Sequence, residues 1–213
     1  MINYYEALTK IRYYGTIPDR VWIEKDSTGL EQVYASLEDR PADLEKWNEP
    51  PHLFLANLLS DETGWPKLAA LRKFTVTYGI LNGYKGPESW IVNPANTRGS
   101  QTLLQKAWRG DMDELSEIEM GDVAQDSEAS FTRDGMELRI DDLWTLTRML
   151  LLRDHAAGRA RVCAIEDCPR TPYFLQARKG QHFCSHPCAV LANVRRFREV
   201  QANRLRRSKS GRR

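Results

Sequence analysis

Four cysteines, the only ones in the chain, lie close together near its C-terminal end, at Cys163, Cys168, Cys184 and Cys188. Their spacing is C-x4-C, then fifteen residues, then C-x3-C, which makes two chelating pairs joined by a loop long enough to fold back. Zn²⁺ takes thiolate ligands in tetrahedral geometry, and four thiolates in this pattern suit it. We therefore expect all four cysteines to hold one structural Zn²⁺ ion.

Two disulfide bonds are the alternative use of four cysteines, and they are typical of small secreted proteins. The N-terminal segment, residues 1–7, has neither the basic region nor the apolar run of a signal peptide. No apolar run approaches the roughly 18 residues needed to span a bilayer. We therefore expect a cytoplasmic protein without a membrane span, in which clustered thiols favour metal.

His182 and His186 flank Cys184 and are the alternative metal ligands. Because four thiols are already available, we expect both histidines to lie outside the coordination sphere. His186 then caps a helix or donates a hydrogen bond to a ligand, as residues around metal ligands commonly do.

Charge is distributed unevenly along the chain, although the formal net charge is only +2. From Gly158 onward there are fourteen basic and three acidic residues, for a net charge of +11, whereas residues 1–157 carry a net charge of −9. Such asymmetry suggests a polyanionic partner for the basic part. We expect seven side chains to contact nucleic-acid phosphates: Arg178, Lys179, Arg195, Arg196, Arg198, Arg206 and Arg207.

The elements around the cysteines can be predicted from local signals. Residues 173–175 and 181–183 have strand character, and the turn at 178–180 is expected to join them as a hairpin. Pro187 suits the first turn of a following helix, which puts Cys188 at the positive end of the helix dipole. A knuckle, a hairpin and a helix that carries the last ligand together predict a treble-clef-like zinc finger.

The helix expected after Cys188 is amphipathic. Val190, Leu191, Val194, Phe197 and Leu205 share one side at a period of 3.6 residues, and arginines occupy the other side. The basic end, residues 201–213, is expected to be disordered without its partner.

Residues 1–157 read as a mixed, helix-leaning domain. The expected strand and hairpin are residues 20–25 and 131–140, the latter turning at Asp134-Gly135. The stretch 39–48 is expected to be a loop or short helix, and the acidic stretch 111–128 a solvated helix or loop. Helices are expected at residues 3–12, 52–59, 65–81, 101–109 and 142–157. The overall prediction is an α+β protein: a mostly helical domain (1–157), a zinc finger (158–200) and a basic tail (201–213).

A family resemblance covers residues 142–198. The leucine-rich helix from Asp142 precedes the finger, which continues with Arg161-Val-Cys163, Asp167-Cys168, Tyr173-Phe174, Arg178-Lys179-Gly180 and Cys184-Ser185. This order resembles the CGNR-type zinc-finger proteins. The resemblance implies a bacterial transcription regulator whose N-terminal helical domain senses stress or a ligand.

The sequence departs from that family's pattern at two places. The second cysteine pair is one residue shorter than the family's, and Ala189-Val190-Leu191 stands where the family has Gly-Asn-Arg. The resemblance therefore carries over the zinc ligands but not the Asn and Arg implicated in DNA contact. Asn193 and Arg195, further along the helix, are the candidates for that role.

No catalytic motif is present: the chain lacks a Gly-rich phosphate loop, G-x-S-x-G and H-E-x-x-H. A zinc ion with four thiolate ligands has no open position at which to activate water. We therefore expect no enzyme but a zinc-binding, DNA-binding transcription regulator that contacts duplex DNA, with an N-terminal domain that senses a ligand or forms a homodimer.

Two alternatives remain open. In a protein-interaction module, Val190, Val194 and Phe197 would dock on a partner. In an RNA-binding factor, Tyr173 and Phe174 would stack on unpaired bases.

Overall fold

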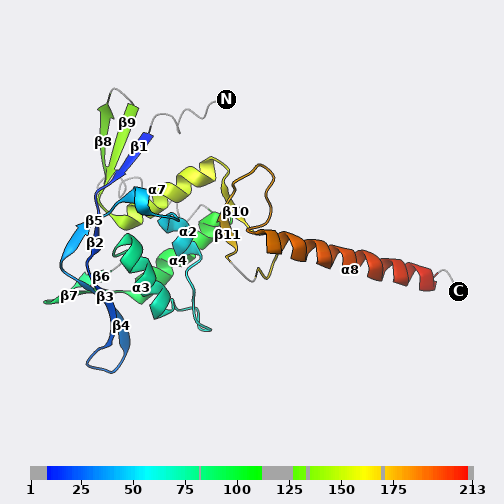
Figure 1. Cartoon of the computed structure of the whole chain (residues 1–213), viewed down its shortest axis with the longest axis horizontal. Coiled ribbons are helices and arrows are strands. Elements are labelled where there is room, and N and C mark those ends of the chain that lie inside the picture. Colours follow the sequence, from blue (N-terminus) through cyan, green and yellow to red (C-terminus); the bar gives the residue numbers. More distant parts are fainter. Residues whose placement is uncertain (1–8, 82, 112–126, 133–134, 169–170, 211–213) are drawn as a thin grey trace.

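The computed structural model describes residues 9–81, 83–111, 127–132, 135–168 and 171–210. Helices and sheets both build the fold, which confirms the α+β prediction (Figure 1). Within these ranges the N-terminal part contains nine strands beside its helices, so it has more sheet than the mostly helical domain that was predicted. The acidic stretch 112–126 and the hairpin residues 133–134 lie outside the described residues.

A four-stranded antiparallel sheet forms one end of the body. Its order is β3 (Val21–Lys25), β4 (Glu31–Ser36), β7 (Ser89–Val92) and β6 (Gly83–Lys85). The strand predicted at residues 20–25 is therefore confirmed. Helix α3 (Leu68–Tyr78) packs on this sheet, where Leu71 meets Val33 and Val92 in a buried cluster.

A three-stranded sheet forms the opposite end, in the order β1 (Thr9–Tyr13), β9 (Gly135–Ile140), β8 (Ser127–Thr132). Strands β8 and β9 form a hairpin where one was predicted, but Gly135 pairs with Thr132 instead of lying in the turn, and β8 begins at Ser127, inside the stretch 111–128 predicted to be helix or loop. The helix predicted at residues 3–12 is wrong over its described part, because β1 pairs in parallel with β9 from Thr9 to Tyr13. Basic residues alternate with Thr, Ile and Tyr here, which is a strand period.

Two short strands and one helical turn lie between the larger elements. Strand β2 (Thr16–Pro18) pairs with β5 (Asp39–Pro41), and the 3-10 helix η1 (Leu44–Lys46) follows. The predicted loop or short helix at residues 39–48 thus contains both a strand and a single helical turn.

Four helices enclose the main core: α2 (Pro51–Ala56), α3, α4 (Pro94–Trp108) and α7 (Leu143–Ala156). Asn93 caps the start of α4 and Asp142 caps that of α7 through Thr145 N at 2.6 Å, whereas α2 and α3 begin without a side-chain cap. Gly158, at φ +67°, ends α7 in the left-handed conformation that glycine adopts readily. The core of these helices includes Leu55, Phe74, Leu104, Leu146 and Leu151.

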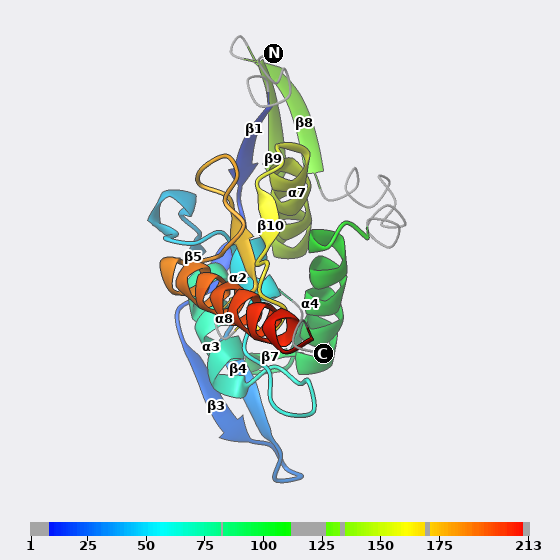
Figure 2. The same ribbon diagram turned by 90° about the vertical axis from the view of Figure 1, so that its right-hand side faces the viewer.

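The last part of the chain contains strands β10 (Ala160–Val162) and β11 (Tyr173–Leu175) and helix α8 (His186–Ser210). The two strands pack on the body, while α8 projects away from it (Figure 1) and lies in front of it when viewed from that side (Figure 2). Helix α8 continues past residue 201, where the basic tail was predicted to begin, as far as Ser210.

Candidate metal centre and basic helix

The four cysteine sulfurs lie together in space. The Sγ atom of Cys184 is 3.6 Å from that of Cys168 and 3.5 Å from that of Cys188, and Cys168 and Cys188 are 3.8 Å apart. All four sulfurs, including that of Cys163, lie within 4.8 Å of one another. These separations are far beyond the ~2.05 Å of a disulfide bond.

The arrangement of the sulfurs fits a tetrahedral metal ion. Sulfurs about 2.3 Å from a Zn²⁺ ion at tetrahedral angles are about 3.8 Å from each other. The three separations of 3.5 to 3.8 Å match that value without rearrangement of the chain. The four predicted ligands are therefore brought together as one candidate metal centre.

Backbone hydrogen bonds hold the two cysteine pairs against each other. Cys163 N donates to Pro172 O at 2.7 Å, and Ala164 N donates to His182 O at 2.9 Å. The second bond links the first cysteine loop directly to the segment before Cys184. Cys188 lies in the first turn of α8, as Pro187 predicted.

The predicted hairpin between residues 173–175 and 181–183 is wrong. Tyr173–Leu175 pairs instead with Ala160–Val162, so the two strands flank the first cysteine pair rather than separating the two pairs. Residues 181–183 form no strand. The turn at 178–180 is confirmed, with Gly180 at φ +80° and Gln181 N bonded to Arg178 O.

Apolar side chains shield the sulfurs from solvent. Cys163 and Cys188 are buried against Ile165 and Phe174, and Leu191 packs beside them. Burial together with the neighbouring thiols raises the pKa of Cys184 to about 12, whereas Ser185 lowers the pKa of Cys188. A divalent metal bound at the cluster would displace the proton of Cys184.

The candidate metal centre is anchored to the body through β11. The side chain of Asn57, after α2, donates to Tyr173 O at 2.9 Å and accepts from Tyr173 N at 3.2 Å. The amide of Asn57 thus bonds the backbone of β11 much as a neighbouring strand would. The indole of Trp108 donates to Arg161 O at 2.8 Å. Ala160 and Tyr173 belong to the main core, so strands on both sides of the predicted boundary at residue 158 share one core.

Tyr173 and Phe174 are 2% and 6% exposed. Their rings face the core and the sulfurs, so they are not available to stack on nucleic-acid bases. The stacking role considered for these two residues is wrong.

A hydrogen-bonded network with a buried centre lies next to this anchor. His52 Nε2 and Asp154 Oδ2 are 2.9 Å apart, both side chains are fully buried, and Arg159 bonds the other Asp154 oxygen. The His52 ring also stacks on Trp108 at 5.5 Å. The network joins α2 and α7 to the segment that enters β10, and it places His52 in the core, where Nε2 is hydrogen-bonded and the buried Nδ1 has no partner among the described residues.

The predicted phosphate-binding residues lie on two exposed surfaces. Arg178 and Lys179 are exposed on the turn before Cys184, where a depression of about 510 Å³ is also lined by His182 and His186. Neither histidine belongs to the sulfur cluster, as predicted. On α8 the predicted residues Arg195, Arg196 and Arg198 are exposed, as is Arg204, whereas the side chains of Arg206 and Arg207 lie outside the described part.

The apolar side of α8 is also exposed. Val190, Val194, Phe197 and Val200 are between 40% and 64% exposed, and of the predicted apolar face it is Leu191 that packs against the sulfur cluster. The helix therefore presents both arginines and an unpaired apolar side to solvent.

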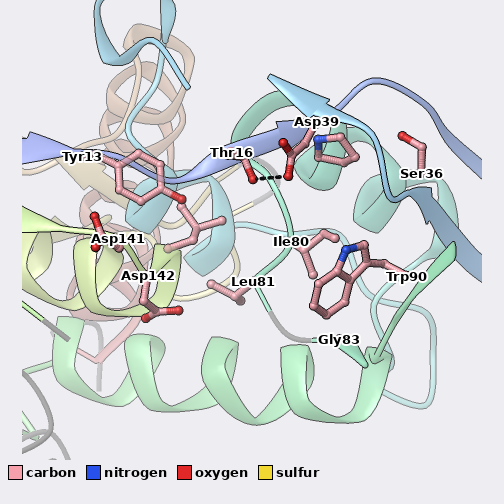
Figure 3. Close-up of a pocket in the computed structure, with 12 residues that line it drawn as sticks. Tyr13, Thr16, Ser36, Asp39, Ile80, Leu81, Gly83, Trp90, Asp141 and Asp142 are labelled. Carbon is pink, nitrogen blue, oxygen red and sulfur yellow. Dashed lines mark hydrogen bonds between the residues drawn. The ribbon is translucent and has the colours of Figure 1, made fainter. Parts of the chain in front are cut away.

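A second cavity, of about 280 Å³, lies between the sheets of the N-terminal part (Figure 3). Tyr13, Asp141 and Asp142 lie on one side of it and Trp90 on the other. Its carboxylates already have structural partners: Asp39 accepts a hydrogen bond from Thr16, and Asp142 caps α7.

No protein-family model matches the chain, and no curated protein is significantly similar to it. The CGNR resemblance therefore stays a prediction. Among the described residues, no helix is long and apolar enough to cross a membrane.

Proposed function

We propose that the protein is a zinc-dependent transcription regulator that binds duplex DNA through α8. The observation that carries this proposal is that Cys188, a member of the sulfur cluster, lies in the first turn of the exposed, arginine-bearing helix. A metal bound to all four cysteines would fix the start of α8 relative to the body.

Charge and shape support a polyanionic partner. Helix α8 contains seven basic residues and one acidic residue, and the turn with Arg178 and Lys179 lies beside its first turn. Cationic side chains on an exposed helix are suited to phosphate contact in a groove wide enough for a helix, such as the major groove of B-DNA.

The finer assignments belong to the same proposal. The first cysteine loop followed by a helix carrying the last ligand supports a treble-clef-like finger of the CGNR type. Zinc has a structural role in it, since four thiolates leave no position for substrate. We further propose that the protein is not an enzyme and that it acts in the cytoplasm.

Removing two arginines tests the proposal. Because each phosphate contact releases counterions, the Arg195→Ala/Arg196→Ala variant should bind duplex DNA more weakly and show a salt slope smaller by about 2. Arg40→Ala, an exposed arginine on the edge strand β5, is the matched control and should bind like the wild type. An unchanged affinity and slope in the double variant would contradict the proposed interface.

The protein-interaction alternative is supported by the exposed apolar side of α8. In that case the double arginine variant would keep its partners, and Phe197→Ser would lose them.

A further inference from the structure

One side of α8 has a spacing that two helices can share. Val190, Val194, Phe197 and Gln201 follow one another at intervals of four, three and four residues. This is the a/d spacing of a coiled coil, in which each helix buries its stripe against the same stripe of its partner. All four residues are exposed.

Gln201 is the polar member of this seam. A single polar residue at an a position lowers the stability of a coiled coil but specifies its register. In a parallel pair Gln201 faces the same residue of the partner, and a side-chain amide can both donate to and accept from another amide. In an antiparallel pair it would face an apolar residue. The polar position therefore favours the parallel, in-register arrangement.

The residues that border the seam are compatible with pairing. Leu191, Asn193, Arg198 and Val200 hold the flanking positions, so one residue of the four is charged. The neighbouring arginines at 195 and 196 lie on the outer side of the helix, where a paired helix would leave them uncovered. Like-charge repulsion across the seam is thereby limited to Arg198.

The seam ends where the basic segment begins. Arg204 holds the next seam position after Gln201, and basic residues follow at 206, 207 and 209. A paired helix would separate from its partner beyond Gln201, because an arginine at a seam position is not buried without a counter-charge. The basic ends would then diverge, as the basic regions of dimeric DNA-binding helices do.

We propose that α8 pairs in parallel with α8 of a second copy along Val190, Val194, Phe197 and Gln201 when both copies bind one duplex. This inference rests on the proposed function, because the duplex supplies the negative charge that two basic helices need. A parallel pair places both basic ends on the same side, where they reach the same duplex.

The size of the seam explains why the duplex is required. Its twelve residues extend about 18 Å along the helix. Stable interfaces bury about 1,600 Å², and coiled coils usually need three to four heptads, whereas this seam has fewer than two. A second copy therefore fits the site only when a common ligand raises its effective concentration.

A second copy is favoured over an acidic helix of another protein. An acidic helix would match the charge of α8 but would cover arginines that the duplex needs. A second copy leaves Arg195 and Arg196 exposed and doubles the number of phosphate contacts.

Site-specific cross-linking tests the pairing. In the zinc-loaded full chain, Gln201→Cys should form a covalent dimer under mild oxidation when a duplex long enough for two copies is present, because seam positions face each other in a parallel pair. Asn203→Cys, on the outer side of the same turn, is the matched control and should stay monomeric. No cross-link at position 201, or equal cross-linking at both positions, would overturn the proposal and leave an acidic helix as the occupant.

A binding measurement distinguishes the proposed helix pairing from the proposed DNA binding on which it rests. The Val194→Ser/Phe197→Ser variant should lose at least about tenfold in apparent affinity on the long duplex, with the Hill coefficient falling from about 2 to about 1. Both variant and wild type should bind equally on a duplex that accommodates one copy, and Asn203→Ser should match the wild type throughout. Absent binding on the short duplex would refute DNA binding itself, whereas normal binding there without cooperativity on the long duplex would refute only the pairing.

Discussion

Cys184 lies between two other sulfurs at 3.5 and 3.6 Å, and its pKa is raised to about 12. A thiol in this position gives up its proton only to a strong counter-charge, and a divalent metal supplies one. The residue is therefore the most sensitive place to ask whether the cluster binds metal.

Cys184→Ser should abolish stoichiometric zinc binding, because a hydroxyl is a poor ligand for this ion and three thiolates leave the site open. The free energy of unfolding in the presence of zinc should fall by more than about 2 kcal/mol. Elemental analysis and urea unfolding measure the two effects. His182→Ala is the control and should retain zinc; a Cys184→Ser protein with full zinc content would refute the four-sulfur site.

His52 predicts a pH dependence of stability. Burial lowers its pKa below the ordinary value of 6.5, although Asp154 opposes the shift. Below pH 6.5 the unfolded chain binds a proton at this residue that the folded chain does not, so the free energy of unfolding falls as the pH falls, by at most about 1.4 kcal/mol per pH unit.

Urea unfolding of zinc-saturated protein at pH 7.5 and pH 6.0 should therefore show a smaller loss of stability in His52→Gln than in the wild type. Protonation of the cysteines affects both proteins equally, so it does not contribute to the difference between their losses of stability. Equal losses in the two proteins would contradict the assignment of the neutral histidine. Asp154, whose pKa lies below 3.8, does not titrate in this window.

The four cysteines of the candidate metal centre could be predicted from the sequence, but the residues that hold their loop in place could not. The ligand type and spacing of the four cysteines are local signals, and they were sufficient. Asn57 lies 116 positions from Tyr173 in the sequence, so no local pattern relates the two residues. Only the folded chain brings that amide to the end of β11.

Among the elements, β10 and β11 position the first cysteine pair. The strand Ala160–Val162 leads into Cys163, and Tyr173–Leu175 follows Cys168, so their pairing closes the loop that carries both ligands. Asn57 supports the closing strand from the body.

Asn57→Ala should lower the free energy of unfolding by about 1–3 kcal/mol, because two hydrogen bonds to the Tyr173 backbone are lost. It should also speed the release of zinc to a chelator, since the loop would close less firmly. A colorimetric chelator assay measures the rate, with the exposed Asn203→Ala as control. Unchanged zinc release would show that the anchor does not support the site.

The elements that were predicted wrongly share a cause. Two short segments, residues 9–12 and 181–183, have a secondary structure that depends on distant strands. The first is a strand because it pairs with β9. The second is not a strand, because β11 pairs with β10 instead. The longer helices α3, α4 and α7 carry their own apolar period and were recognised, although α4 begins at Pro94, before the predicted residue 101.

In the whole molecule, the candidate metal centre and the N-terminal part share a core. Ala160 and Tyr173 pack with Leu146 and Trp108, and the His52–Asp154–Arg159 network lies beside them. Loss of metal should therefore lower the stability of the N-terminal part as well as that of the segment that carries the cysteines.

Chelation should lower the melting temperature of the main calorimetric transition, because disorder at Cys163 and Cys168 would loosen β10 and β11 against the core. Calorimetry with and without a chelator checks this, and readdition of zinc should restore the transition. A main transition that does not move, accompanied by loss of a separate small one, would instead indicate an autonomous finger.

The central claim is that bound metal makes α8 competent to bind DNA. The most direct test is duplex-DNA binding by zinc-loaded and chelated protein at two salt concentrations. We predict one zinc per chain, salt-sensitive binding by the loaded protein, and loss of that binding on chelation. Equal affinity with and without zinc, or an affinity that does not change with salt, would contradict the account.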